Sequence, residues 1–377
     1  MKIKRLTMLL ASMAIMSASS FAQAEEVVVG VQLPMTGAVA SWAGPPIHRG
    51  IELAVNQINE QSLLGEGRTL RIILGDNASE KSQAIALATQ FANREDVSLM
   101  VGPATSPLAG AAAPVANEAG LPTIALAVSK RVTQTGKWIF KIYQDPDVLM
   151  TDAAEHIVEA MHPKTATLVF ARDNDAFVSY KNLLKKYFEA HGVTDIHEES
   201  ILSSDSDFSA LATKVVYRPT DIVYLGVSPE SAANIAIQVR QNGLPPSSVL
   251  IGNDEMGAPG YVKIGGRAVE GTVYPSFFYA DSSKPDIDAF IKSYQAAYGE
   301  APDQYSAIGY GSMLVAANAL KKAGPNASHE QIREALASTA DVSTVLGAGS
   351  LTFDEYRNPH YGVVMLTIRD GKSVLSE

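Results

Sequence analysis

The chain has 377 residues, of which 30 are Lys or Arg and 40 are Asp or Glu, so its formal net charge is −10. This negative balance argues against binding to nucleic acid or to anionic membrane surfaces, because both attract positively charged proteins. The sequence contains no cysteine, which excludes a disulfide framework and a lipid anchor carried by a thiol.

The first 24 residues predict a secretory signal peptide. Lys2, Lys4 and Arg5 precede the apolar run LTMLLASMAIMSASSF, and AQA comes directly before Glu25, which is the pattern of a signal cleaved after Ala24. The apolar run is too short for a membrane span. We therefore expect an exported, periplasmic protein. The remaining chain exceeds the usual size of one hydrophobic core, so two domains are expected.

Short apolar runs alternate with segments of helical period along most of the chain. In the first part, strands are expected at 27–33, 70–76, 97–102 and 121–128, and helices at 47–60, at 82–93 and from Ser106 onward. In the second part, strands are expected at 166–171, 194–201, 221–227, 248–254 and 271–278, and helices at 148–160, 176–190, 207–217 and 229–242. This alternation predicts two doubly wound α/β lobes with parallel sheets. Ligands of such folds bind outside the carboxyl ends of the strands.

After residue 280 the pattern changes to three successive helices, followed by a late strand, a turn and a terminal hairpin. The helices are expected at 285–299, 303–322 and 328–338. Because three helices in a row cannot extend the second alternation, we expect them to return to the first lobe. The chain then crosses between lobes near 143–147, 275–280 and 348–353. Lobe one comprises 25–144 with 278–350, and lobe two comprises 145–277 with 351–377.

Sequence signatures of catalysis are missing. The chain has no G-x-S-x-G, H-E-x-x-H, P-loop or G-x-G-x-x-G motif, and these are the common marks of hydrolases, zinc proteases and nucleotide-binding enzymes. Its seven histidines are scattered, with no cysteine to join them in a metal site. We therefore expect a binding protein that is not an enzyme and that carries no metal or cofactor.

The first strand-end loop, residues 34–50, is long for a connection of its type and presents Trp42 just before Pro45 and Pro46. Two prolines here favour the start of a helix. Tryptophan is an unusual choice for a mobile polar loop, so we favour its role as an aromatic wall facing a ligand. The alternative is that Trp42 only packs between the loop and the helix.

The next two strand-end loops carry hydroxyl groups. Thr105 and Ser106 follow a strand, with Ser106 at an N-cap position and Pro107 at the first helical position. A helix N-terminus offers free N–H groups and partial positive charge to a carboxylate. From these residues alone, two roles of Ser106 stay open: it binds an anion, or it only caps its own helix. In the loop at 125–131, small residues precede Ser129; they would let a ligand approach the main chain, and a simple turn explains them nearly as well.

Lobe two offers carboxylates at a strand end. Asp254 and Glu255 follow the expected strand at 248–254; one of them could hold an ammonium group at a cleft, or both could form a solvated acidic turn. Phe177 and Ser228 lie at the ends of neighbouring strands. Ser228 could equally serve only as the N-cap of the helix that follows it.

Several stretches, in this order and spacing, resemble the leucine/isoleucine/valine-binding family of periplasmic receptors, the type I solute-binding proteins of ABC importers. The resemblance covers essentially the whole mature chain. It rests on VVVGVQLPMTGAVASWAGPPIHRGIELAVNQIN, VGPATSPLAGAAAPVANEAGLPTI, DFSALATKV, VEGTVY and GSLTFDEYRNP.

The resemblance implies two lobes joined by three crossover segments that close on a ligand like a hinged trap. It also implies how an amino acid would be held. The ligand carboxylate would bind main-chain N–H groups of lobe one and Ser106. The ammonium would bind the carbonyl of Ala127, the hydroxyl of Ser129 and the carboxylate of Asp254. Trp42 would lie near the ligand side chain.

The sequence departs from the family at two tyrosine positions, where it has Phe177 and Ser228. Two polar aromatic contacts of the family are thus lost or replaced, which leaves room for a ligand other than a branched-chain amino acid. The resemblance as a whole implies a small carboxylate-bearing ligand, an amino acid of branched-chain or related type, delivered by a monomeric receptor to an ABC permease. Two alternatives stay open. The ligand is an aromatic carboxylate or an amide, or the protein is a sensor that hands its closed form to a signalling partner.

Overall fold

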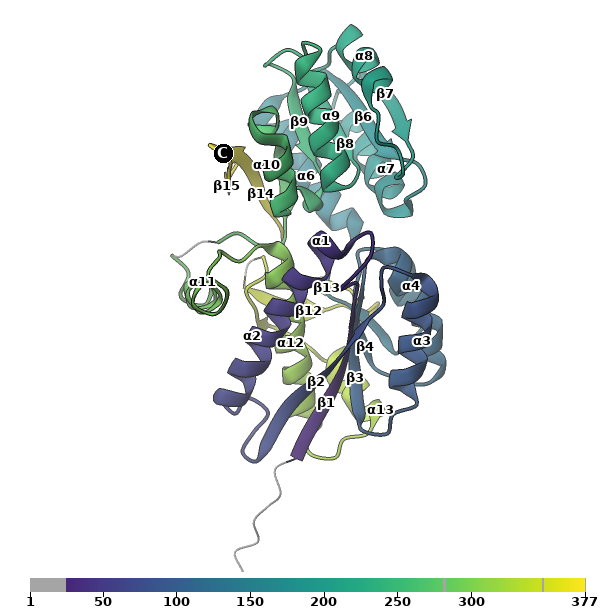
Figure 1. The fold of residues 1–377 in the computed structure, drawn as a ribbon, viewed down its shortest axis with the longest axis vertical. Coiled ribbons are helices and arrows are strands. Elements are labelled where there is room, and N and C mark those ends of the chain that lie inside the picture. The colour runs from purple at the N-terminus through teal and green to yellow at the C-terminus, as the bar shows by residue number, and fades with distance from the viewer. Residues whose placement is uncertain (1–24, 281–282, 348, 377) are drawn as a thin grey trace, which may run out of the picture.

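The computed structural model describes residues 25–280, 283–347 and 349–376. The signal peptide expected at 1–24 lies outside the described residues. Two α/β lobes lie end to end along the long axis of the molecule (Figure 1). The prediction of two doubly wound lobes is confirmed.

The elements follow one another as strand and helix through most of the chain. The strands are β1 Glu25–Leu33, β2 Arg68–Asp76, β3 Val97–Ala104, β4 Thr123–Leu126, β5 Ile139–Lys141, β6 Thr165–Ala171, β7 Asp195–Ile201, β8 Ile222–Gly226, β9 Val249–Gly252, β10 Val273–Ser276, β11 Val342–Ser343, β12 Ser350–Phe353, β13 Pro359–His360, β14 Val364–Arg369 and β15 Lys372–Leu375. The helices are α1 Ala40–Ala43, α2 Pro45–Glu60, α3 Lys81–Ala92, α4 Ser106–Glu118, α5 Lys130–Gln134, α6 Pro146–Met161, α7 Asp175–Ala190, α8 Ser209–Tyr217, α9 Pro229–Gln241, α10 Pro259–Gly265, α11 Pro285–Tyr298, α12 Gln304–Ala323 and α13 His329–Ala337, with short 3₁₀ turns η1 Asp254–Gly257 and η2 Gly266–Val269.

The sheet of lobe one is parallel, in the order β2-β1-β3-β4-β5. Alternate residues of β1 point to opposite faces, as strand geometry requires. Val29 and Val31 belong to the core shared with α2 and α12, whereas Val28 packs in a separate cluster with α3 and α4. Both faces of the sheet are therefore covered, and this explains why β1 reads as a continuous apolar run.

The sheet of lobe two repeats this order as β7-β6-β8-β9-β10, followed by the antiparallel strands β14 and β15. In each lobe the second strand pairs on one side of the first strand, and the third strand pairs on its other side. The switch points therefore lie between β1 and β3 in lobe one and between β6 and β8 in lobe two. A crevice forms at such a switch point, outside the carboxyl ends of the strands. The carboxyl ends of strands from both sheets meet at the boundary between the lobes, since Ala104 of β3 and Ala171 of β6 line one common cavity.

The segment after α13 differs from its expected course. Residues 351–377 were expected in lobe two, but β12 and β13 pack on lobe one. The Phe353 ring lies 5.3 Å from that of Phe140, and the Arg357 side chain donates to the carbonyls of Ile139 and Thr133. The third connection between lobes is therefore at 361–363, and only β14 and β15 lie in lobe two.

A tight turn explains this difference. The Asp354 carboxylate accepts hydrogen bonds from the main-chain N–H groups of Tyr356 and Asn358, which is the local bonding that favours Asp in turns. The turn sends the chain back along lobe one before it crosses. The sequence shows the turn residues but not the partner on which the hairpin packs.

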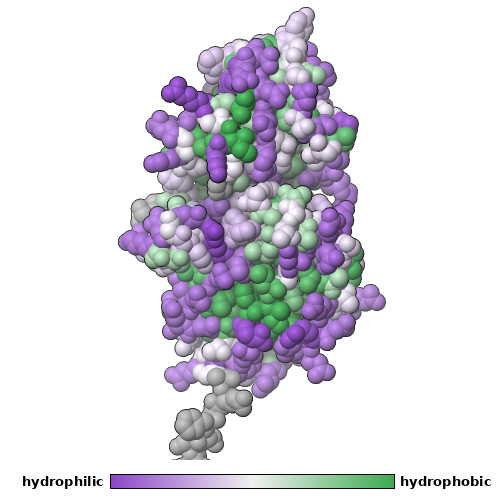
Figure 2. Space-filling view, in the orientation of Figure 1, coloured by the Kyte–Doolittle hydropathy of each residue, from purple (hydrophilic) through white to green (hydrophobic). Residues whose placement is uncertain are grey.

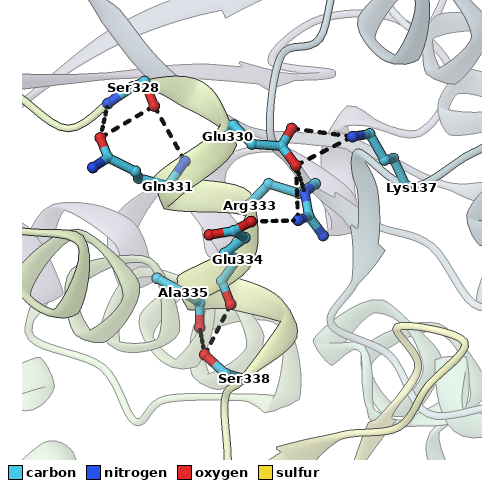
Figure 3. A network of polar contacts seen from close by, with 8 residues as sticks. All are labelled: Lys137, Ser328, Glu330, Gln331, Arg333, Glu334, Ala335 and Ser338. Atoms are coloured by element: carbon cyan, nitrogen blue, oxygen red, sulfur yellow. Dashed lines mark hydrogen bonds and ion pairs between the residues drawn. The ribbon is translucent and has the colours of Figure 1, made fainter.

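Helix α13 is fastened to lobe one by polar contacts at its start (Figure 3). Ser328 and Gln331 form a reciprocal capping box. The Glu330 carboxylate accepts from Lys137, in the loop before β5, and from Arg333 one turn along the helix. These contacts hold the start of α13 against the loop before β5 of lobe one.

Strand β2 forms an edge of the lobe-one sheet. Its residue Leu74 is 39% exposed, and an apolar area covers the part of lobe one where β1 and β2 run (Figure 2). Arg71 on the same strand pairs with Glu26, with 2.8 Å between Nε and Oε2. Charged side chains on an edge strand oppose pairing with another chain.

Among the described residues, we find no helix with both the length and the apolar character needed to cross a membrane.

Candidate ligand-binding site

A cavity of about 310 Å³ lies between the lobes, at the carboxyl ends of the strands of both sheets. Every predicted site residue except Ser129 lines it, namely Trp42, Thr105, Ser106, Ala127, Phe177, Ser228 and Asp254. The site is therefore built from strand-end loops of both lobes, as the switch-point rule predicts.

The lobe-one side of the cavity is formed by the start of α4. Ser106 was expected as the N-cap, but α4 begins at Ser106 itself; its N-cap is Thr105, whose side chain makes no capping hydrogen bond. The Oγ of Ser106 accepts from the main-chain N–H of Ser129, 3.2 Å away. The first turn of α4 thus has no side-chain cap, so its N–H groups and the positive end of its dipole are available to an anion.

Thr105, directly before this helix, has φ of 74° and ψ of 144°. A β-branched residue strongly disfavours positive φ, and such outliers cost about 1–3 kcal/mol and cluster at functional sites. Its main-chain N–H donates to the carbonyl of Leu126 on the neighbouring strand. This hydrogen bond helps to hold the strained turn beside the cavity, which Thr105 lines.

Ser129 lies beside the cavity and outside its lining. It precedes α5, and its main-chain N–H is the group that meets Ser106. The lining of this loop is supplied by Ala127 and Val128. The side chain of the buried Lys141 donates to the carbonyl of Val128 at 2.9 Å, and burial lowers the pKa of this lysine to about 8. This hydrogen bond fixes the main chain of the loop that contains Ala127 and Val128.

Aromatic side chains from both lobes line the cavity. The rings of Trp42, on α1, and Tyr305, on α12, are 5.4 Å apart and tilted. Trp42 therefore both packs within lobe one and faces the cavity. Phe177 and Tyr180 lie 6.5 Å apart on α7, and Tyr143 comes from the first connection between lobes. The expectations based on the loops missed the three tyrosines.

The lobe-two side is acidic. Asp254 and Glu255 both line the cavity on η1, and Glu230 joins them from α9. Asp254 is 3% exposed, and its Oδ1 accepts from the Tyr180 hydroxyl at 3.4 Å. Burial raises the pKa of Asp254 to about 7, against smaller opposing effects of its hydrogen bonds. Burial, and then the charges of Asp254 and Glu230, raise the pKa of Glu255 well above its usual value.

The sequence placed Asp254 at the end of a strand, whereas it begins a 3₁₀ turn after β9. The reason is local. The Asn253 side chain accepts from the main-chain N–H of Glu255 at 2.8 Å and donates to the carbonyl of Val227. This pair of bonds ends the strand and turns both carboxylates toward the cavity.

Two buried polar atoms of the lining have no hydrogen-bond partner among the described residues: the Tyr305 hydroxyl and Oε2 of Glu255. Buried polar groups are nearly always paired, with protein or with something bound. The described lining contains Asp254, Glu255 and Glu230 but no Lys, Arg or His. No group of His, Cys, Asp and Glu suited to hold a metal occurs in the described part of the chain.

Polar contacts join the lobes around the cavity. The Ser41 hydroxyl of α1 donates to Oε1 of Glu230 at 3.4 Å. Arg131 of α5 pairs with Asp175 of α7 at 2.9 Å. The Gln304 side chain donates to the main-chain oxygen of Asp254. These contacts link residues of the two lobes beside the cavity.

A model of the family of periplasmic binding proteins matches residues 26–372. Leu/Ile/Val-binding protein homolog 1 of Brucella melitensis is 28% identical over 337 residues, which are 89% of this chain and 88% of that protein.

Solved structures share the fold. A leucine-binding protein from Thermotoga maritima has a TM-score of 0.84 and 25% identity, covering 93% of this chain and 98% of its own. A solute-binding protein of an ABC transporter from Rhodopseudomonas palustris, in complex with benzoate, has a TM-score of 0.81 and 23% identity, covering 93% and 95%. These two proteins differ in the ligand they are described with, so the fold alone does not decide the ligand.

Proposed function

This chain belongs to the family of periplasmic binding proteins, and we propose that it is the solute receptor of an ABC importer. In this proposal it captures a small carboxylate-bearing ligand, an amino acid, by closing its two lobes. It then delivers the ligand to a membrane permease, without performing a reaction. The proposal places the mature protein in the periplasm as a monomer.

One observation carries the choice of an amino acid: the cavity has opposite polarity at its two sides. The uncapped start of α4, with Ser106, favours a carboxylate on the lobe-one side. Asp254 favours an ammonium group on the lobe-two side. A zwitterion satisfies both sides at once. Closure excludes water, and this strengthens hydrogen bonds that involve charged groups.

The names of relatives support the same class of ligand. The Brucella melitensis relative is named for binding leucine, isoleucine and valine, and the Thermotoga maritima protein for binding leucine. The apolar and aromatic part of the lining, with Trp42, Phe177 and Tyr305, would hold the ligand side chain.

An aromatic carboxylate is the second candidate, favoured by the same aromatic lining. It would leave Asp254 and Glu255 facing the ligand without a cation. Oε2 of Glu255 would then stay buried without a hydrogen-bond partner among the described residues, which is costly for a polar group, so a zwitterion, which brings N–H donors to this side, fits the described lining better.

A thermal-shift screen tests the proposal. The mature protein is heated with each standard amino acid, with the corresponding amino amides, and with 4-methylpentanoate and benzoate. The amides lack the carboxylate, and the two acids lack the ammonium group. A ligand at 100 times its Kd adds about 2.7 kcal/mol of stability.

We expect at least one amino acid to raise the melting temperature, and its amide and the simple acids to raise it far less. A response to amides alone would remove the carboxylate site at Ser106. A response to benzoate or 4-methylpentanoate equal to that of the amino acid would favour the second candidate.

A further inference from the structure

The acidic side of the cavity has more carboxyl groups than one ammonium group needs. Asp254, Glu255 and Glu230 all line it, and the described lining has no basic side chain. The positive end of α4 lies on the opposite lobe and would be used by the ligand carboxylate. An amino acid with an apolar side chain thus brings one cationic group to three carboxyl groups.

Burying a polar atom without a hydrogen-bond partner is unfavourable, and two atoms of the described lining are buried in this way. Glu255 Oε2 is buried without a hydrogen-bond partner among the described residues, and so is the hydroxyl of Tyr305, which is 1% exposed. Oxygen Oε1 of Glu230, in contrast, accepts from Ser41 of the other lobe. The group that a ligand would satisfy is therefore Glu255, with Glu230 close enough to act on its charge.

We propose that the bound solute carries a second cationic nitrogen group, on its side chain, which donates hydrogen bonds to Glu255 between Asp254 and Glu230. The solute class is then a basic amino acid with an amine or guanidine side chain. This inference rests on the proposed function, since it assumes that Asp254 holds the α-ammonium group and α4 the carboxylate.

The apolar lining is compatible with such a ligand. Basic side chains have a methylene stem of apolar character and a charged head. Trp42 and Tyr305 would pack against the stem, and the head would reach the carboxyl groups. A charge-assisted hydrogen bond contributes more than a neutral one, so the head should dominate the choice of ligand.

Matched ligand pairs test this inference by isothermal titration. L-lysine is compared with L-norleucine, which has a similar stem without the amine. L-arginine is compared with L-citrulline, in which a neutral urea replaces the guanidinium. We expect the cationic member of at least one pair to bind 10-fold tighter or more. In Glu255→Gln that ratio should fall toward one, because the variant loses the charge-assisted hydrogen bond that only the cationic member makes.

Glu230→Gln serves as the second variant, on a different element, and should reduce the same ratio by a smaller factor. Far-UV circular dichroism and the melting temperature establish that each variant folds. Equal or tighter binding of norleucine and citrulline by the wild-type protein overturns this inference and leaves the proposed function intact. So does a 10-fold preference that survives in both variants. Binding of none of the four amino acids, together with no response in the thermal screen, overturns both.

Discussion

The hydroxyl oxygen of Ser106 accepts a hydrogen bond from the main-chain N–H of Ser129, 3.2 Å away. This bond joins the loops that follow β3 and β4, the two strands whose ends face the cavity from lobe one. Ser106 is the first residue of α4, after the N-cap Thr105, so this bond fixes its hydroxyl at the start of the helix. The same atom can donate its hydrogen to a ligand carboxylate while it accepts from Ser129, since a hydroxyl is both donor and acceptor.

Ser106→Ala should weaken binding of the amino-acid ligand by about 10- to 100-fold, because a hydrogen bond to a charged group contributes about 1.5–3 kcal/mol. Titration calorimetry measures the change. Ser82→Ala, on the exposed face of α3, is the matched control and should bind as the wild type does. Unchanged affinity in Ser106→Ala would place the carboxylate elsewhere.

A close approach of two helices determines where Trp42 and Tyr305 meet. A Cβ added at Gly50 of α2 would lie 1.9 Å from the carbonyl oxygen of Ser306, and one at Gly309 of α12 would lie 2.1 Å from that of Ile47. Both obstacles are main-chain atoms, which cannot move aside cheaply. Glycine at these positions lets α12 pack against α2, beside the helix that carries Trp42.

Gly50→Ala should therefore destabilise the protein by about 1–3 kcal/mol or more, as overpacking does, and should weaken ligand binding as Tyr305 shifts. Denaturant unfolding measures the first effect and calorimetry the second. Gly110→Ala on α4 is the matched control, because nothing lies within 4 Å of its added Cβ. That variant should be neutral or more stable by up to about 1 kcal/mol. A stable Gly50→Ala protein would show that the helices can separate without cost.

Much of the fold was predictable because its strands and long helices have a strong apolar period. The helices α2, α7 and α9 and the strands β1, β6 and β8 were expected close to where they lie. The short helices α1, α5 and α10 were not expected, because a few residues carry no period. The crossing at 361–363 was missed because the contacts of the hairpin are with residues distant in sequence.

The site residues also divide into those that local sequence features reveal and those that only long-range packing brings to the cavity. Strand-end loops are local features, so Trp42, Ser106 and Asp254 could be named from the sequence. Tyr305 comes from α12, far along the chain, and reaches the cavity through helix packing that no local pattern reveals. Tyr180 was within reach of prediction, because it lies three residues after Phe177 and thus on the same helix face.

Lys141→Met should destabilise lobe one. The carbonyl of Val128 would lose the donor that lies 2.9 Å away, and an unsatisfied buried acceptor costs about 1–3 kcal/mol. The variant should also bind ligand several-fold more weakly, because Val128 belongs to a loop that lines the cavity. Lys137→Met, which removes an exposed ion pair with Glu330, is the control and should change stability by less than about 1 kcal/mol. Denaturant unfolding of both variants checks the difference, and equal stabilities would contradict the role given to Lys141.

Stability without ligand should depend on the ionisation of Asp254. Its pKa is about 7 in the folded protein and about 3.9 in an unfolded chain. Between these values the unfolded chain is ionised and the folded one is protonated. The free energy of unfolding should therefore fall as pH rises from about 4 to about 7, by at most about 4 kcal/mol from this residue, and then level off. Glu255, whose pKa is also raised, acts in the same direction.

Ligand binding should reverse this effect, because an ammonium group beside Asp254 favours the ionised carboxylate. Binding should then release a proton below pH 7, and affinity should rise as pH increases toward 7. Calorimetry in buffers of different ionisation enthalpy measures the released proton, and unfolding at several pH values measures stability. Asp254→Asn should reduce the pH dependence of both quantities and leave the part that Glu255 contributes, whereas Asp370→Asn, at an exposed residue of the β14–β15 turn, should keep both profiles. Proton uptake on binding, or a profile that Asp254→Asn leaves unchanged, would remove Asp254 from the site.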